Sequence, residues 1–170
     1  MKLSKVEVIC GFGLGKTSLA LGKGIAALTE QKKVIMIQFL KGNTKNDGIE
    51  LLKGLEPEFK VFRFEKSSAC FADLSEQEKK EELMNIRNGF NFAKKVVTTG
   101  ECDMLILDEV LALIDRNIIT LEDFERLLEA REEGMSLILT GKVFPEKLRP
   151  YVDVISTIDH IEVDKNDKEC

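Results

Sequence analysis

The sequence predicts an α/β fold built on a mostly parallel central sheet of about six strands. Apolar segments of strand length alternate with amphipathic segments of helix length from one end of the chain to the other. Most of the apolar segments are continuous runs, which is typical of strands that are covered on both faces. The expected strands are Val6–Cys10, Val34–Leu40, Lys60–Phe64, Met104–Leu107, Ser136–Thr140 and Val152–Ser156.

The expected helices span residues 19–28, 76–98 and 121–133. The longest follows Ser75-Glu76-Gln77-Glu78, which has the pattern of a capping box, and Gly100 is a suitable stop for it. Thr120 is expected to cap the third helix. Apolar residues at intervals of three and four predict the buried stripe of the longest helix: Leu83, Ile86, Phe90, Ala93 and Val97.

The size and charge of the chain limit its possible functions. A length of 170 residues predicts one domain, residues 1–170, with a charged tail at 164–170 that is expected to fray. Apolar residues make up 44% of the chain and charged residues 32%, as in ordinary soluble globular proteins. The net charge of −5 argues against a general nucleic-acid-binding surface.

The cysteines indicate a reducing environment. They are scattered, without a C-x-x-C pair, at Cys10, Cys70, Cys102 and Cys170. Neither a zinc site nor a disulfide framework is expected from this spacing. No apolar run has transmembrane length, and the N-terminus lacks the long hydrophobic segment of a signal peptide. We therefore expect a cytoplasmic protein without a membrane partner.

The first expected strand leads into Gly11-Phe12-Gly13-Leu14-Gly15-Lys16-Thr17-Ser18. Glycines allow a backbone to curl until several N–H groups point at one anion. Lys16 adds a positive charge, the Thr17 hydroxyl can hold Mg²⁺, and the helix that follows directs its positive end to the same place. This arrangement predicts a phosphate-binding P-loop for a nucleoside triphosphate and narrows the fold to a three-layer P-loop NTPase (RecA-like).

Two other interpretations of this segment remain open. Cys10 stands where the strict P-loop pattern has a glycine, so the segment could be an ordinary glycine-rich turn that carries a lysine. A nicotinamide or flavin fingerprint fits less well, because it requires an acidic residue at the end of the second strand, where Gln38-Phe39 stands.

Polar residues follow several of the expected strands where each strand ends. Open α/β sheets bind ligands beyond the carboxyl ends of their strands, so this clustering favours one shared site. Asp108-Glu109 ends an apolar strand, as in a Walker B motif, and offers hard oxygen ligands to a divalent cation. The sequence leaves open whether Glu109 holds the metal or polarises a water molecule. Lys41 and Lys142 follow other strands and can neutralise phosphate charge.

From about Val6 to Asp159 the chain resembles the P-loop corrinoid adenosyltransferases. The P-loop of that family typically reads G-N-G-K-G-K-T-T and also lacks the first Walker glycine. The other family patterns, Q-F-[IL]-K-G, L-D-E, A-R, [IL]-T-G-[RK] and A-D-x-[VI], appear here as Gln38-Phe39-Leu40-Lys41-Gly42, Leu107-Asp108-Glu109, Ala130-Arg131, Leu139-Thr140-Gly141-Lys142 and Val152-Asp153-Val154-Ile155.

The resemblance implies transfer of the 5′-deoxyadenosyl group of ATP to the cobalt of a reduced Co(I) corrinoid, with release of triphosphate. ATP and the corrinoid are then co-substrates, Mg²⁺ is the cofactor, and a flavoprotein reductant and a homodimer are implied partners. The catalytic residues implied are Lys16, Lys41 and Glu109, and the metal residues are Thr17, Asp108 and Glu109. The binding residues implied are Gly11–Ser18, Gln38, Lys41, Phe71, Thr140 and Lys142.

The chain also departs from the family pattern. Many members carry an aromatic G-F-T-W segment after the third strand, where this chain has Ser68-Ala69-Cys70-Phe71. Leu14 replaces the P-loop lysine, and Ala26 replaces an arginine of the following helix. Two alternatives therefore stay open. One is another P-loop ATPase or small-molecule kinase, and the other is a non-catalytic protein that binds a nucleotide or a corrinoid.

Overall fold

The structure is a computed structural model that describes residues 4–40, 52–64 and 73–161. Its helices are α1 (Lys16–Leu28), α3 (Glu76–Thr99), α4 (Leu111–Asp115) and α5 (Leu121–Glu129), with 3₁₀ turns η1 (Lys53–Leu55) and η3 (Glu146–Tyr151). Its strands are β1 (Val6–Cys10), β2 (Val34–Gln38), β3 (Phe59–Arg63), β4 (Met104–Asp108), β5 (Ser136–Thr140) and β6 (Val154–Thr157).

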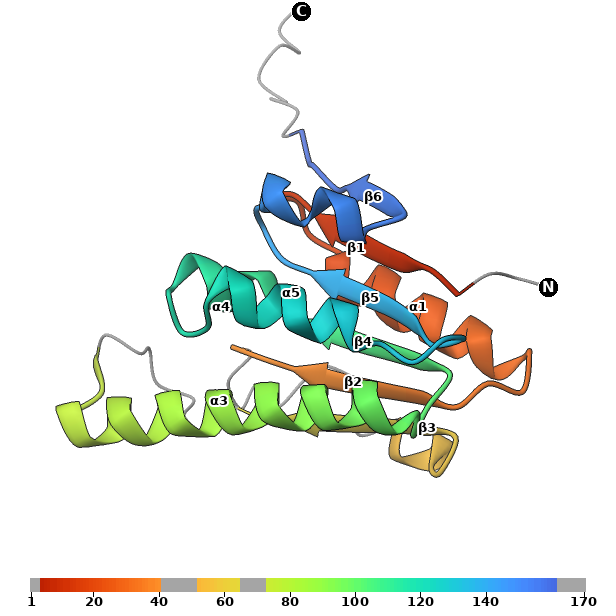
Figure 1. Ribbon diagram of the computed structural model, residues 1–170, viewed down its shortest axis with the longest axis horizontal. Helices are drawn as coiled ribbons and strands as arrows, with labels where there is room; N and C mark the ends of the chain where they lie inside the picture. The colour runs from red at the N-terminus through yellow and green to blue at the C-terminus, as the bar shows by residue number, and fades with distance from the viewer. Residues whose placement is uncertain (1–3, 41–51, 65–72, 162–170) are drawn as a thin grey trace, which may run out of the picture.

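The strands form one six-stranded sheet in the order β3-β2-β4-β5-β1-β6, and all neighbouring strands are parallel (Figure 1). This architecture confirms the predicted α/β fold with its parallel sheet. Strand β5 lies between β1, which leads into the P-loop, and β4, which carries Asp108. All six strands therefore end at the same edge of the sheet, which we call the carboxyl edge; the opposite one is the amino edge.

Helices cover both faces of the sheet. On one face, α1 packs through Ala20 and Ala27 against a cluster that includes Ile106 and Ile138. On the other face, α3 and α5 pack against alternate residues of the same strands (Figure 1). Gly24 allows α1 to approach the sheet, since a Cβ there would lie 2.7 Å from the ring of Phe59. Burial on both faces explains why the strands are continuous apolar runs.

Most of the expected elements are confirmed, with differences at several ends. Helix α3 begins at Glu76, directly after the N-cap Ser75 of the predicted capping box, and its C-cap Gly100 adopts a left-handed conformation. Helix α5 ends at Glu129, short of the predicted end, and the short helix α4 is not predicted by the sequence pattern. In the described part of the chain, no helix combines the length and apolar character needed to cross a membrane.

Candidate nucleotide-binding site

The loop after β1 is held in a curled conformation by the ends of two neighbouring segments. The N–H of Gly11 donates to the carbonyl of Lys142 at 2.9 Å, and the N–H of Gly13 donates to the carbonyl of Ile158 at 2.8 Å. Gly11 has φ +108°, and a Cβ on it would lie 2.3 Å from the Ile158 oxygen. Only glycine fits at this position, because both the backbone angle and the close approach exclude a side chain.

Lys16 and the start of α1 give the loop its positive potential. The Lys16 side chain is 8% exposed, and its ammonium donates to the carbonyl of Gly13 at 2.8 Å. Gly15 is the N-cap of α1, so no side chain caps the helix, and its first turn contains no acidic residue. The positive end of the helix therefore keeps its full capacity to bind an anion.

The last residues of four adjacent strands form a row of polar side chains across the carboxyl edge, which we call the terminal row. Its members are Arg63 of β3, Gln38 of β2, Asp108 of β4 and Thr140 of β5. Gln38 is the register partner of both Arg63 and Asp108. Leu107 and Leu139 pair directly before Asp108 and Thr140. Parallel register thus brings side chains that are distant in sequence next to one another.

Asp108 is the centre of this row. Its side chain is fully buried, and its carboxylate accepts from Thr140 Oγ1 at 2.7 Å, from Gln38 Nε2 at 3.0 Å and from Thr17 Oγ1 at 3.0 and 3.1 Å. Uncharged donors on three sides compensate for the desolvation of the carboxylate. The contact with Thr17 connects the terminal row to the P-loop helix.

Glu109 follows Asp108 at a sharp turn of the backbone. Its φ is +62°, in the left-handed region, and its N–H donates to Thr140 Oγ1 at 2.8 Å. Such angles cost energy in residues other than glycine and are maintained by surrounding contacts, often at functional sites. The Glu109 side chain is half-buried, and its backbone N–H shares the Thr140 hydroxyl with the Asp108 carboxylate.

The structure places the predicted site residues as follows. The loop residues, Gln38, Asp108, Glu109 and Thr140 gather at the carboxyl edge. Lys142 lies beside the P-loop with an exposed side chain. Lys41, Phe71 and the segment 68–71 lie outside the described residues. Sequence reasoning missed Arg63, although it ends a strand as the predicted residues do.

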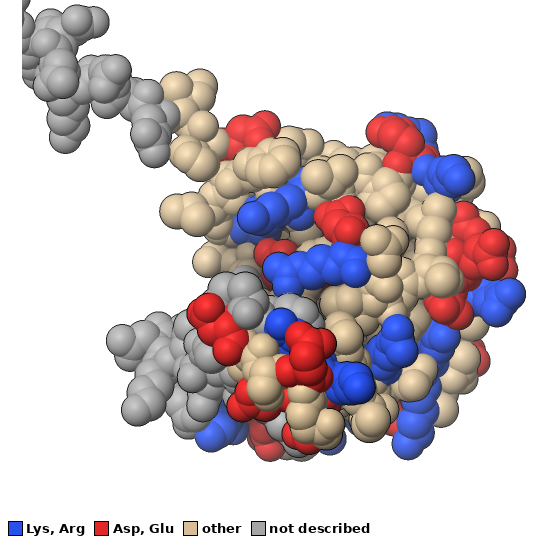
Figure 2. All heavy atoms as spheres, turned by 90° about the vertical axis from the view of Figure 1, so that its left-hand side faces the viewer, with Lys and Arg blue, Asp and Glu red and all other residues tan. Residues whose placement is uncertain are grey.

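Figure 2 looks onto the carboxyl edge, where basic and acidic side chains lie side by side near the centre of the described surface. Phe12 and Leu14 of the P-loop are 68% and 88% exposed, which is unusual for large apolar side chains in the middle of a polar site. The carboxyl edge therefore offers both an anion site and an apolar surface.

Two of the motif residues do not lie at this edge. Asp153 precedes β6, and its carboxylate accepts from the N–H of Val6 at 2.8 Å, at the start of β1. The Arg131 guanidinium donates to the Met135 carbonyl and, at 3.1 Å, to Ser4 Oγ. Both residues thus connect the beginnings of strands, a structural role at the amino edge.

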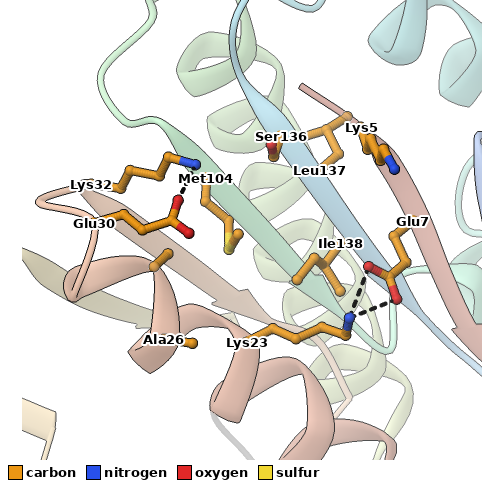
Figure 3. A pocket seen from close by; sticks show the side chains of 11 residues that line it. Lys5, Glu7, Lys23, Ala26, Glu30, Lys32, Met104, Ser136, Leu137 and Ile138 are labelled. Atoms are coloured by element: carbon orange, nitrogen blue, oxygen red, sulfur yellow. Dashed lines mark hydrogen bonds and ion pairs between the residues drawn. The ribbon is translucent and has the colours of Figure 1, made fainter. Parts of the chain in front are cut away.

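A pocket of about 310 Å³ lies at the amino edge, between α1 and the beginnings of β1, β4 and β5 (Figure 3). Two of the three lysines that line it, Lys23 and Lys32, are paired with carboxylates. Lys23 contacts Glu7 at 3.0 Å, and Lys32 contacts Glu30 at 2.9 Å (Figure 3). Because these lysines are already neutralised by carboxylates, the pocket lacks the concentrated positive potential of the P-loop.

The parallel sheet, the loop with its buried lysine and the Thr17–Asp108 contact define a P-loop nucleotide-binding protein of the class in which one strand separates the two Walker motifs. A profile of the family ATP:corrinoid adenosyltransferase BtuR/CobO/CobP matches residues 3–167. The chain belongs to this family, and adenosyl transfer from ATP to a corrinoid is accordingly its activity.

Curated relatives agree with this assignment. The chain is 27% identical over 153 residues to a corrinoid adenosyltransferase of Escherichia coli strain K12, an alignment that covers 90% of this chain and 75% of the relative. It is 26% identical, with the same coverage, to the corrinoid adenosyltransferase CobA of Salmonella typhimurium strain LT2. An uncharacterized protein of Nostoc is 26% identical over 82% of this chain and 39% of its own length.

Proposed function

We propose that the carboxyl edge of this single nucleotide-binding domain holds ATP and a Co(I) corrinoid together, so that the cobalt attacks C5′ of the ribose. The observation that supports this most directly is the convergence of the buried Lys16, the Thr17–Asp108 contact and the uncapped start of α1. These features suit a triphosphate, whose developing negative charge is the main electrostatic demand of the reaction.

Within this proposal the P-loop amides have separate tasks. The N–H groups of Gly11 and Gly13 already donate to backbone carbonyls of other segments. These two residues therefore shape the loop, and the amides from Leu14 onward are those that contact phosphate. Lys16 exchanges its contact with the Gly13 carbonyl for a phosphate oxygen, which replaces a neutral acceptor with a charged one.

Mg²⁺ fits the residues that the structure brings together. The Thr17 hydroxyl and the Asp108 carboxylate are hard oxygen ligands 3.0 Å apart. In the described ranges, no three His, Cys, Asp or Glu side chains form a cluster that could hold a metal ion. A site made of few protein ligands completed by phosphate oxygens and water is the arrangement Mg²⁺ prefers. When bound, the cation would supply charge neutralisation for the leaving triphosphate, and Glu109 is proposed to bind it directly or through water.

The reaction needs no nucleophile from the protein, because the cobalt itself attacks the ribose. Co(I) donates an electron pair to C5′, the C5′–O bond breaks, and that pair leaves with the triphosphate. The cobalt becomes Co(III) with a carbon ligand. The protein contributes alignment of the two substrates and stabilisation of the departing charge.

The corrinoid is proposed to lie over the exposed apolar part of the P-loop. Phe12 and Leu14 are 68% and 88% exposed, and both belong to the loop that is proposed to bind ATP. A corrin ring has broad apolar faces, so burying these side chains against it gives a favourable hydrophobic contribution. Lys41 and Phe71 remain proposed contacts for the triphosphate and the corrinoid. A flavoprotein reductant and a homodimer are proposed from the family.

The test is an anaerobic incubation of the protein with Mg-ATP and chemically reduced cobalamin or a corrinoid precursor. We expect light-sensitive adenosylcorrinoid and triphosphate to accumulate in equal amounts. A matched reaction without reductant should give neither product. Release of ADP instead of triphosphate would identify an ATPase or kinase, and nucleotide binding without either product would identify a non-catalytic binding protein; each result contradicts the proposal.

A further inference from the structure

Arg63 is the member of the terminal row that lies farthest from the P-loop. Its Nε donates to Gln38 Oε1 at 2.9 Å. The other end of the same amide, Gln38 Nε2, donates to Asp108 Oδ2 at 3.0 Å. A chain of hydrogen bonds thus runs from β3 through β2 to β4, and Asp108 continues it to Thr17 of α1.

The direction of these hydrogen bonds, from donor to acceptor, is fixed at both ends of the series. An arginine side chain can only donate hydrogen bonds, and an ionised carboxylate can only accept them. Gln38 must therefore present its oxygen to Arg63 and its nitrogen to Asp108. Gln38 is 2% exposed, so no solvent is available to replace either partner.

We propose that Arg63 is a positioning residue for Mg-ATP binding, which acts through Gln38 to hold the Asp108 carboxylate toward Thr17. This inference rests on the proposed Mg-ATP site. Without Arg63 the buried Gln38 oxygen loses its donor, and an unsatisfied buried carbonyl is costly. The amide then turns away to find another partner, and Asp108 loses one of the donors that orient it. Outer hydrogen-bond partners of this kind commonly tune metal affinity.

The experiment compares R63M with K60M. Lys60 is an exposed cationic residue of the same strand and serves as the matched control. ATP binding is titrated by calorimetry at a series of Mg²⁺ concentrations, with EDTA as the metal-free point, and unfolding in urea is measured for each variant. We expect R63M to require about 10–100-fold more Mg²⁺ for tight ATP binding. Its metal-free ATP affinity should match that of K60M.

A double-mutant comparison tests whether Arg63 acts through Gln38. Q38L should raise the Mg²⁺ requirement as R63M does, and the double variant should be no worse than Q38L alone, because both changes interrupt one chain. Losses that add up, or an R63M protein with the Mg²⁺ requirement of K60M, would overturn the inference. R63K should lie between R63M and the unmodified protein, because lysine lacks the planar donor fork.

The remaining outcomes are also decisive. If R63M fails to fold, R63K takes its place, and an R63K protein with an unchanged Mg²⁺ requirement would overturn the inference. ATP binding needs no corrinoid, so a failure of adenosyl transfer refutes the proposed reaction without touching the role of Arg63. ATP binding by the unmodified protein that does not respond to Mg²⁺ would refute the positioning role.

Discussion

The two edges of the sheet use charged residues in opposite ways. At the amino edge, ion pairs such as Lys23–Glu7 and Lys32–Glu30 are partly exposed and neutralise each other locally. At the carboxyl edge, the Asp108 carboxylate is fully buried and accepts from the neutral side chains of Thr140 and Gln38, while the Lys16 ammonium donates to a backbone carbonyl. The lysines of these amino-edge pairs are neutralised within the protein, whereas Lys16 at the carboxyl edge can still pair with an anionic ligand.

Backbone geometry separates the edges in the same way. At the carboxyl edge, Gly11, Gly15 and Glu109 all have positive φ values, at the points where β1 and β4 leave the sheet. At the amino edge, positive φ values occur at Gln31, Gly100 and Gly134, which lie at the end of a helix or in a turn, where left-handed residues are common. The comparison indicates that backbone strain together with a buried polar network locates a site better than pocket volume does.

The strongest test of the comparison uses two lysines on the same helix. Lys16→Ala should lower ATP affinity and the rate of adenosyl transfer by about 100-fold or more, because it removes the charge that is proposed to face the triphosphate. Lys23→Ala should change both by less than about twofold, since it removes one exposed ion pair. Calorimetry with Mg-ATP and the anaerobic transfer assay measure both effects. Equal losses for the two variants would abolish the distinction between the edges.

A second test compares two glycines with similar backbone angles at opposite edges. Gly134→Ala should cost about 1–2 kcal/mol of unfolding free energy, because φ is +100° there although space is open. Gly11→Ala should cost about 1–3 kcal/mol more, because its Cβ would also meet the Ile158 carbonyl at 2.3 Å. Urea unfolding midpoints measure the difference, with unchanged slopes as the check on two-state behaviour. Equal midpoints would show that the P-loop backbone shifts to accommodate the added Cβ without a further loss of unfolding free energy.

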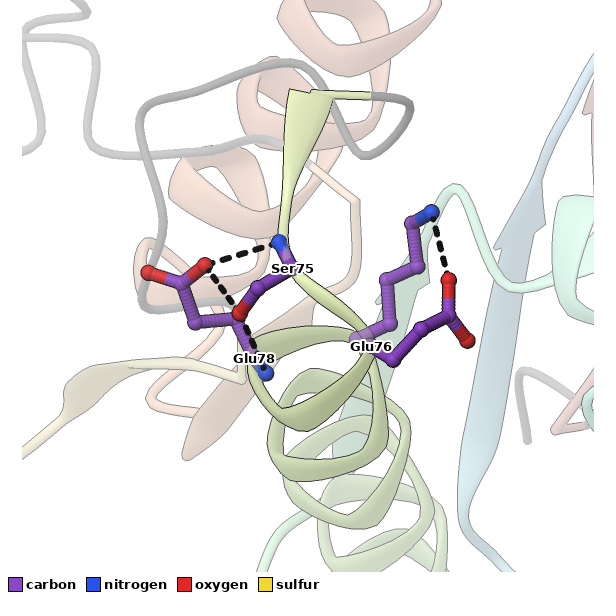
Figure 4. A network of polar contacts seen from close by, with 4 residues as sticks. Ser75, Glu76 and Glu78 are labelled. Carbon is purple, nitrogen blue, oxygen red and sulfur yellow. Dashed lines mark hydrogen bonds and ion pairs between the residues drawn. The ribbon is translucent and has the colours of Figure 1, made fainter.

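A third test concerns the start of α3, where the capping box closes the helix (Figure 4). Ser75 N–H and Oγ donate to the Glu78 carboxylate at 2.8 and 2.6 Å, and these bonds hold the pKa of Glu78 below its ordinary value of 4.5. Ser75→Ala should cost about 1 kcal/mol at neutral pH. Gln77→Ala in the same turn is the control, expected to change stability by less than about 0.5 kcal/mol.

The pH dependence of this cap has a definite sign. The pKa of Glu78 is lowered in the folded protein, so the stabilisation is complete above pH 4.5 and is lost as the pH falls through the folded value. The gap between the unmodified protein and Ser75→Ala should therefore narrow below pH 4.5. Thermal unfolding at a series of pH values measures it. A gap that stayed constant would mean that Glu78 does not take part in the cap.

The last test concerns Cys102, just before β4 at the amino edge, where almost no reaction with a thiol reagent is expected. Burial raises the pKa of its thiol from 9.0 to about 12, so the reactive thiolate is depleted about 1000-fold relative to an ordinary cysteine. Iodoacetamide at pH 8 should leave Cys102 unmodified in the folded protein and label it after unfolding in urea. Peptide mass spectrometry reads both results, and rapid labelling in the folded state would contradict the burial.

Much of the fold could be predicted because its signals are local. Strands buried on both faces are continuous apolar runs, and β1 and β5 have their predicted bounds. The capping box at Ser75 and the left-handed Gly100 follow from side-chain chemistry within one helical turn. The five-residue helix α4 is too short for such a pattern, and α5 ends early where the Arg131 side chain turns to the Met135 carbonyl.

The motifs of the candidate site could be predicted from the sequence, but the hydrogen bonds that connect them could not. The P-loop and Asp108-Glu109 are contiguous motifs, so the sequence identifies them directly. The contacts of Gln38 with Arg63 and Asp108 depend on the strand order and on parallel register, which no local pattern contains. The predicted ligand role of Gln38 stays a prediction, and the structure adds that its amide is engaged by both neighbours.

The placement of β1 between β5 and β6 has a consequence for biosynthesis. Strand β1 pairs with β5 and β6, and the P-loop N–H groups of Gly11 and Gly13 donate to the carbonyls of Lys142 and Ile158. During translation β1 therefore stays unpaired until β5 and β6 have left the ribosome. A nascent chain that stops before β6 has the P-loop sequence but lacks the Ile158 carbonyl that holds Gly13, so we expect nucleotide affinity to develop only after β6 has been synthesised.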